Sequence, residues 1–258
     1  MPDGAAGCRI RFTKLGRIRF TSQRDVARMW ERALRRSALE VAWSAGFSPR
    51  PLLSFGLALP TGCESTAEYL DVRLDHAPRP GALDPAALGA LLPDGLEVTR
   101  TAVLPDGGSS LQQEVSSCTW ELEVHGVTHR ELKGRIERAL DAPSLPVRRE
   151  RKGRLLEDDL RPLVLSLSAT GPLAGPVEPR ADEAGGPAPT LGIGAELATR
   201  PRGVRPMELL TVLGPEVTLV RARRTTQWIE SDGGRSEPLP LEGEPPGAVV
   251  PHAAERAS

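Results

Sequence analysis

Apolar and polar residues alternate near the amino end of the chain and then recur at helical spacing. Residues 8–14 and 17–20 place apolar side chains at every second position between basic neighbours, which predicts two half-buried strands. Ser22 can cap the helix predicted over 23–38, where apolar positions recur at three- and four-residue steps. The short apolar stretch at 41–43 predicts another strand. The chain therefore begins with strands that flank a helix.

The same succession of strands and helices continues to residue 229. Further elements predicted in the first part of the chain are strands at 52–58, 67–74 and 96–104 and a helix at 84–92. Those predicted in the second part are strands at 114–124, 145–151, 154–168, 191–198 and 217–229, with helices that begin at 128 and at 205. Each part has the βαββαβ order of ferredoxin-like folds. We expect an α+β protein with two tandem ferredoxin-like halves and antiparallel sheets.

The joints between these parts are rich in glycine and proline. The segment PDGGSS at 105–110 separates an N-terminal half, residues 8–104, from a C-terminal half, residues 112–229. Residues 170–189 consist largely of proline, glycine, alanine and acidic residues, which predicts a disordered insertion. The composition of residues 230–258 predicts a disordered C-terminal tail for the same reason.

The composition argues against several classes of protein. No apolar run approaches the roughly 20 residues that span a bilayer, and the first residues lack a secretion-signal pattern, so we expect a cytoplasmic protein without membrane contact. Three scattered cysteines, Cys8, Cys63 and Cys118, form no disulfide framework, zinc pair or iron–sulfur triplet. Glycine-rich phosphate loops, HExxH and the nucleophile elbow are also absent. The sequence therefore indicates no catalytic residue, metal or cofactor.

Charge is distributed unevenly along a chain whose formal net charge is only −1. Between residues 8 and 51 eleven cations face three anions, Asp25, Glu31 and Glu40. A positive region attracts an anionic partner, and RNA is the first candidate because the arginine guanidinium binds phosphate oxygens at two points. The candidate anion- or RNA-binding residues are Arg11, Lys14, Arg17, Arg19, Arg24, Arg28, Ser48 and Arg50. The alternative is that these cations are solvated on outer faces or pair with acids of the same chain.

The aromatic residues near this positive region allow both a binding and a structural interpretation. RNA bases stack on exposed aromatic rings, although core packing is the more frequent use of such residues. The aromatic residues available are Trp43, Phe47, Phe55 and Tyr69. The glycine- and proline-containing turn at 46–51 can place Ser48 and Arg50 at a ligand, or it can serve as a tight connection.

Three carboxylates lie at or near one predicted strand, namely Glu64, Glu68 and Asp71. On a strand Glu68 and Asp71 face opposite sides, so we do not expect one shared carboxylate site. We expect these residues to act chiefly as ion-pair partners of nearby arginines.

Motifs in both halves carry a family resemblance. Those in the N-terminal half are RFTKLGRIRF at 11–20, ERALRR at 31–36, SAGFSP at 44–49, PTG at 60–62 and ESTAEYLD at 64–71. The C-terminal half is more loosely similar, at 151–153, 158–162 and 205–206. Together these motifs resemble the radical SAM-linked domain family, whose molecular activity is not established. The resemblance covers residues 8–229.

The resemblance implies a partner role. Members of that family occur alone, or fused to or encoded beside B12-binding radical SAM enzymes. Because this chain lacks cluster-binding cysteines, the resemblance implies a non-catalytic adaptor of such an enzyme, which binds RNA or another anionic partner through its basic N-terminal half. A plainer interpretation is a scaffold that stabilises the enzyme through protein contacts alone.

The alternative from another class is a metal-independent, ribonuclease-like RNA-processing enzyme, because tandem ferredoxin-like folds include such enzymes. RNA cleavage of this kind needs a general base, most often a histidine. The first histidine, His76, lies outside the basic region, so Lys14, Ser22 or Tyr69 would have to replace it.

Overall fold

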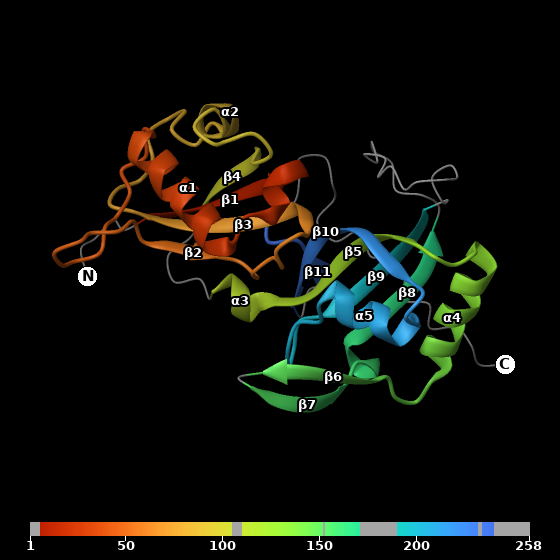
Figure 1. The fold of residues 1–258 in the computed structure, drawn as a ribbon. Helices are drawn as coiled ribbons and strands as arrows, with labels where there is room; N and C mark the ends of the chain where they lie inside the picture. The colour runs from red at the N-terminus through yellow and green to blue at the C-terminus, as the bar shows by residue number, and fades with distance from the viewer. Residues whose placement is uncertain (1–5, 105–109, 152, 171–189, 232–233, 240–258) are drawn as a thin grey trace.

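The computed structural model describes residues 6–104, 110–151, 153–170, 190–231 and 234–239 (Figure 1). The elements of the N-terminal half are β1 (Ala6–Lys14), the 3-10 helix η1 (Gly16–Phe20), α1 (Gln23–Arg36), β2 (Leu53–Phe55), β3 (Glu64–Leu74), α2 (Pro85–Gly89) and β4 (Val98–Leu104). Those that follow are α3 (Leu111–Glu114), β5 (Val115–His125), α4 (His129–Asp141), β6 (Pro146–Arg151), β7 (Arg154–Asp159), η2 (Arg161–Leu163), β8 (Val164–Thr170), β9 (Leu191–Ala198), α5 (Pro206–Leu213), β10 (Thr218–Ser231) and β11 (Gly234–Ser236).

One sheet runs through both halves of the molecule. Its order is β4-β1-β3-β10-β5-β9-β8, with β2 beside β3 and β11 beside β10. All of its pairings are antiparallel except that of β3 with β10, which is parallel. Strands β6 and β7 form a separate two-stranded ribbon. The structure confirms an α+β protein with a largely antiparallel sheet, and it joins in one sheet the halves that we expected to carry separate sheets.

The two halves correspond in strand order. In the N-terminal half the order is β4-β1-β3-β2, and in the C-terminal half it is β10-β5-β9-β8. Each half also has two helices in corresponding places along the chain, α1 and α2 in the first and α4 and α5 in the second. The β6–β7 ribbon lies between α4 and β8 in the chain and has no counterpart in the N-terminal half.

The N-terminal core lies between the sheet and the helices α1 and α2 (Figure 1). Helix α1 begins where the Ser22 hydroxyl accepts a hydrogen bond from the Asp25 amide, as the sequence predicts. The fully buried Trp30 on its inner face meets Phe12 of β1 edge to face, with ring centroids 5.1 Å apart. Because α1 buries only this face, its other side chains are left for solvent or a partner.

Three predicted strands differ from the structure. Residues 41–43 form no strand and take part only in isolated bridges, Val41 with Leu74 and Trp43 with Pro51. Residues 17–20 form η1 instead of a strand, since Gly16 takes a positive φ of 68° that ends the extended chain, and Ile18 is the only buried residue of the turn. The strand predicted over 154–168 is divided by η2, which contains Pro162 and so lacks one backbone donor. As a result β7 pairs with β6, whereas β8 pairs with β9.

The expectation of a disordered tail does not hold for residues 234–239. They include β11, and Leu239 is buried in a small cluster with Tyr69 and Leu111. Residues 230 and 231 of the predicted tail belong to β10, and residue 170 of the predicted insertion belongs to β8. The other residues of both segments, 171–189, 232–233 and 240–258, lie outside the described residues.

Gly95 provides a test of how tightly η1 packs against the approach to β4. Its φ is +88°, and an added Cβ would lie 2.4 Å from the carbonyl oxygen of Leu15 and 2.9 Å from Ile18 Cγ2. Gly62 has a nearly identical φ of +89°, with no atom within 4 Å of an added Cβ. Gly62→Ala therefore measures only the left-handed strain, about 1–2 kcal/mol. We expect Gly95→Ala to cost clearly more free energy of unfolding in urea titrations, and equal costs would contradict the packing described.

Candidate anion-binding face

Strand β1 is buried on both faces, so its arginines do not reach the surface. Arg9 donates from Nε and Nη2 to the carboxylate of Asp71 at 2.7 and 2.9 Å. Arg11 forms an ion pair of 3.1 Å with Glu237, in the segment that follows β11. The expectation of a half-buried β1 was therefore wrong. Arg11, which we expected in the anion-binding surface, is neutralised inside the protein.

Lys14 also lies in the interior, at 2% exposure. Its Nζ donates a hydrogen bond of 2.8 Å to the backbone carbonyl of Thr21. Burial lowers the pKa of Lys14, and the nearby Glu68 carboxylate counteracts only part of this effect. We expected Lys14 to contact an anionic ligand, but its side chain is buried and its ammonium group is bonded to a backbone carbonyl of its own chain.

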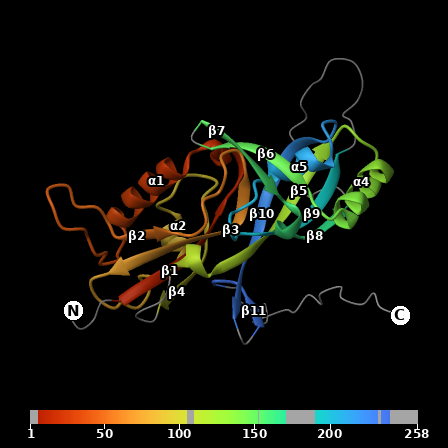
Figure 2. The ribbon, with the colours of Figure 1, turned by 90° about the horizontal axis from the view of Figure 1, so that it is seen from below.

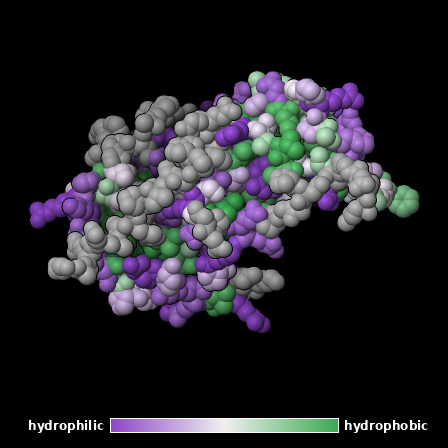
Figure 3. Space-filling view, turned by 180° about the vertical axis from the view of Figure 1, so that it is seen from behind, coloured by the Kyte–Doolittle hydropathy of each residue, from purple (hydrophilic) through white to green (hydrophobic). Residues whose placement is uncertain are grey.

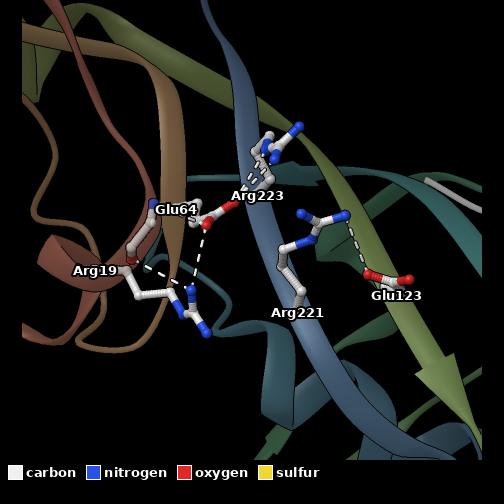
Figure 4. Close-up of polar contacts among 6 residues, drawn as sticks. Arg19, Glu64, Glu123, Arg221 and Arg223 are labelled. Atoms are coloured by element: carbon white, nitrogen blue, oxygen red, sulfur yellow. Dashed lines mark hydrogen bonds and ion pairs between the residues drawn. The ribbon is translucent and has the colours of Figure 1, made fainter. Parts of the chain in front are cut away.

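Arginines from both halves converge on Glu64 where β3 meets β10 (Figure 4). Arg19 Nη1 lies 3.5 Å from Glu64 Oε1, and Arg223 Nη2 lies 2.9 Å from Glu64 Oε2. Between β10 and β5, Arg221 forms an ion pair of 3.2 Å with Glu123. Arg19, another expected anion-binding residue, is thus held by an acid of its own chain.

The most deeply buried ion pair joins the two halves. Arg224 Nη2 on β10 donates to Glu68 Oε1 on β3 at 2.6 Å and to the carbonyl of Leu57 at 2.7 Å, and the two charged side chains are 2% and 7% exposed. Burial acts against the charge of Arg224, but Glu68 and then Cys118 outweigh it, so the pKa of Arg224 lies above its ordinary value. The expectation that Glu64, Glu68 and Asp71 serve as ion-pair partners is confirmed.

The outer side of α1 carries an exposed row of arginines. We call Arg24, Arg28, Arg32, Arg35 and Arg36 the arginine row. At 100° and 1.5 Å per residue, they fall within an arc of about 120° and extend about 18 Å along the helix. The buried residues of α1, Val26, Trp30, Ala33 and Leu34, occupy the opposite arc. The helix therefore presents one continuous positive edge.

Most of this positive charge remains available. Arg28 meets Asp25 at 3.3 Å, but this pair is about half exposed and contributes little. The Ser22 hydroxyl and then Arg28 lower the pKa of Asp25, which keeps that carboxylate ionised. Within the described part of the chain, Arg24 and Arg32 have no hydrogen-bond or ion-pair partner. Helix α1 carries five arginines against two acids, Asp25 and Glu31.

A loop with exposed aromatic residues follows α1. The Ser44 amide donates to the carbonyl of Arg50 and the Arg50 amide to Ser44 Oγ, at 2.8 and 3.0 Å, which closes the loop. Phe47 within it is fully exposed. Just before it, the ring of Trp43 is partly exposed and lies 4.4 Å from the guanidinium of Arg35. Figure 2 shows the loop projecting beyond the carboxyl end of α1.

The arginine row and this loop form one candidate site, which we call the basic–aromatic face: the row together with Trp43, Phe47, Ser48 and Arg50. Seen from behind, most of the coloured surface is hydrophilic, with a smaller apolar area over the N-terminal half (Figure 3).

The structure sorts the predicted site residues into two groups. Arg17, Arg24, Arg28, Ser48 and Arg50 are exposed, whereas Arg11 and Lys14 are buried and Arg19 is paired. Arg32, Arg35 and Arg36 were missed, although their spacing along the predicted helix already placed them beside Arg24 and Arg28. Core packing was expected for the aromatic residues. It holds for Tyr69 and not for Trp43 or Phe47, while Phe55 is half-buried.

Neither a metal-binding cluster nor a membrane-spanning helix is present in the described residues. No group of three or more histidine, cysteine, aspartate or glutamate side chains within those ranges is arranged to hold a metal ion. None of the helices there combines the length and apolar character needed to cross a bilayer.

Comparison with known protein families identifies the family of this protein. Residues 8–185 match a family described as an uncharacterized protein conserved in bacteria (DUF2344). Because the match spans more than half of the chain, the protein belongs to this family. No curated protein matches the chain. This match confirms that the protein belongs to a family of unknown function. The link to radical SAM enzymes, which the sequence resemblance implied, stays a prediction.

The buried pair between Glu68 and Arg224 can be tested by breaking it from either side. Glu68→Ala or Arg224→Ala leaves one charge buried without its partner, and we expect each to cost about 3–5 kcal/mol of unfolding free energy. The double variant Glu68→Leu/Arg224→Met removes both charges and should recover most of that loss. Chemical denaturation measures all three.

The exposed pair between Arg148 and Glu157 is the matched control, with side chains 78% and 72% exposed. Its disruption by Arg148→Ala should change stability by less than about 1 kcal/mol. If breaking the buried pair costs no more than breaking the exposed one, the charges do not hold the halves together.

Proposed function

We propose that this protein binds single-stranded RNA through the basic–aromatic face and acts as a non-catalytic adaptor of a radical SAM enzyme. The RNA part rests on one observation, the exposed arginine row on α1 with Arg24 and Arg32 free of partners within the described residues. The enzyme part rests on the sequence resemblance alone.

The charge arrangement supports a polyanion in preference to a single small anion. The arginine row extends about 18 Å, with steps of about 6 Å between residues four apart. An extended phosphate backbone can meet several guanidinium groups at once, and each contact releases a condensed counterion. A single carboxylate or phosphate could use only one part of the row.

The exposed rings support a single strand in preference to a duplex. In a duplex the bases are stacked on each other, whereas unpaired bases are free to stack on aromatic side chains. Phe47 is fully exposed on its loop, and Trp43 already stacks with Arg35 at the end of the arginine row. A strand that follows the row can therefore place bases on the loop.

The ribonuclease-like alternative has less support. Lys14 is buried with its Nζ bonded to Thr21, and the Ser22 hydroxyl donates to Asp25 as part of the α1 cap. Tyr69 is buried, and burial raises the pKa of its phenol well above the ordinary value. These residues, which would have to replace a histidine base, are all engaged or inaccessible.

We also propose that each half is a ferredoxin-like unit. The support is the strand order, β4-β1-β3-β2 and β10-β5-β9-β8, in which the first and third strands of each half are antiparallel neighbours. In this interpretation the β6–β7 ribbon is an insertion into the second unit.

RNA binding is tested by reversing charge on the row. We expect Arg24→Glu/Arg32→Glu to weaken binding of a labelled single-stranded 12-mer RNA by at least about tenfold, since two phosphate contacts become repulsive. The logarithm of the wild-type binding constant should fall linearly with the logarithm of the salt concentration. Fluorescence anisotropy at low and moderate salt measures both effects.

The matched control reverses two exposed arginines on the β6–β7 ribbon, Arg148→Glu/Arg154→Glu, with the same change in net charge. It should leave the affinity within about twofold. Equal losses in both double variants would indicate a non-specific effect of net charge, and no RNA binding by the wild type at low salt would rule out the proposed function.

Base stacking is tested by Phe47→Ala. The ring makes no contribution to the core, so the variant should unfold like the wild type. We expect its affinity for single-stranded RNA to fall about fivefold or more, because a stacked base contributes about 1–3 kcal/mol. Affinity for a duplex of the same length should change little. An unchanged affinity for the single strand would remove Phe47 from the face.

A further inference from the structure

A groove with a volume of ≈ 680 Å³ lies beside the arginine row. One wall is the carboxyl-terminal part of α1, with Met29, Arg32, Arg35 and Arg36, and the other is the segment 90–93 that follows α2. Asp94 comes next in the chain but does not line the groove, and no acidic residue does. Three of the five arginines of the row therefore line one hollow.

The three guanidinium groups are positioned differently and keep donors for a ligand. Arg36 Nη2 donates to the Leu91 carbonyl at 2.7 Å, which fastens the two walls together. Arg35 Cζ lies over the Trp43 ring, and the N–H groups of Arg35 form no hydrogen bond within the described residues, so they are able to donate. Arg32 has no partner within the described residues, so all of its donors are available.

The remaining lining is apolar. Met29 on α1 and residues 90–93, whose sequence is Ala-Leu-Leu-Pro, supply it. An apolar wall next to a cluster of cations suits a ligand with one charged end and one flat, weakly polar part. A nucleotide has this character, and the volume lies within the range of about 300–1,000 Å³ typical of small-molecule sites.

We propose that this groove binds the terminal phosphate of a single-stranded RNA together with the nucleoside that carries it. The inference rests on the proposed function and adds which part of the RNA is recognised. An internal phosphodiester carries one negative charge, whereas a terminal phosphate monoester carries about −1.5 to −2 at neutral pH and presents three acceptor oxygens. Three guanidinium groups around one hollow match the monoester, and a diester would leave part of their charge unbalanced.

The position of the groove also determines the path along which a bound RNA leaves it. The groove takes the carboxyl-terminal end of the arginine row, and Arg28 and Arg24 continue from it towards the start of α1. An RNA whose end is held in the groove therefore runs along the helix, with its internal phosphates on these two residues. Recognition of an end distinguishes processed or cleaved RNA from the interior of a long transcript.

The test uses the full chain and four single-stranded 10-mer RNAs of one sequence, with phosphate or hydroxyl at the 5′ end and, separately, at the 3′ end. Each carries its fluorophore at the opposite end. We expect phosphate at one of the two ends to strengthen binding about tenfold, the effect of charge-assisted hydrogen bonds. The responding pair identifies the end. If RNA binds but neither phosphate changes the affinity, the groove inference fails and the proposed function stands. If no RNA binds, both fail.

Three variants locate the effect. Arg32→Ala should abolish the preference for the phosphorylated end, and Arg32→Lys should restore part of it, since lysine keeps the charge without the planar fork. Arg24→Ala removes an equally free arginine outside the groove, so it should weaken both RNAs alike and keep the preference. Retention of the preference in Arg32→Ala, with thermal unfolding unchanged, would overturn the assignment to this groove.

Discussion

Apart from Lys14, each charged side chain that is buried in the described part of the chain forms an ion pair, and the pair between Glu68 and Arg224 is the most deeply buried of them. Strands β3 and β10 are parallel neighbours in register only at Glu64 with Arg223 and at Ser65 with Arg224. So short a ladder supplies little by itself to hold two halves together. The buried pair adds one charge from each half, and neither charge is compensated if its half stands alone. Glu64, held by Arg19 and Arg223, repeats this arrangement at the edge of the junction.

The same requirement separates the cations of the N-terminal half into a buried group and an exposed group. Cations on or near β1 are close to acids of β3 and of the segment after β11, so they are neutralised inside. The arginines of α1 project away from the sheet, and among the described residues only Asp25 forms an ion pair with one of them. An excess of charge that is spread over more than forty residues of sequence thereby becomes a single exposed edge on one helix. The proposed RNA-binding role depends on this separation between inner and outer cations.

Much of the local structure followed from short-range patterns. The cap and inner face of α1, the bounds of β9 and the start of α4 could all be predicted, because capping and periodicity involve residues a few positions apart. The two-sided burial of β1 could not be, because its second cover comes from residues 234–239, more than 220 positions away and of a composition that suggests disorder. Alternation over four residues also could not distinguish η1 from a strand. At the candidate site, helical spacing already pointed to the arginine row, whereas the exposure of Trp43 and Phe47 depends on a loop whose direction no local pattern determines.

Photo-crosslinking tests most directly whether the outer cations form the RNA-binding face. The protein would be irradiated with a single-stranded RNA that contains 4-thiouridine, and the crosslinked peptides would be identified by mass spectrometry. We expect crosslinks in α1 and in residues 41–50, with yields that fall when salt is raised. Crosslinks confined to the C-terminal half, or to the β6–β7 ribbon, would contradict this account.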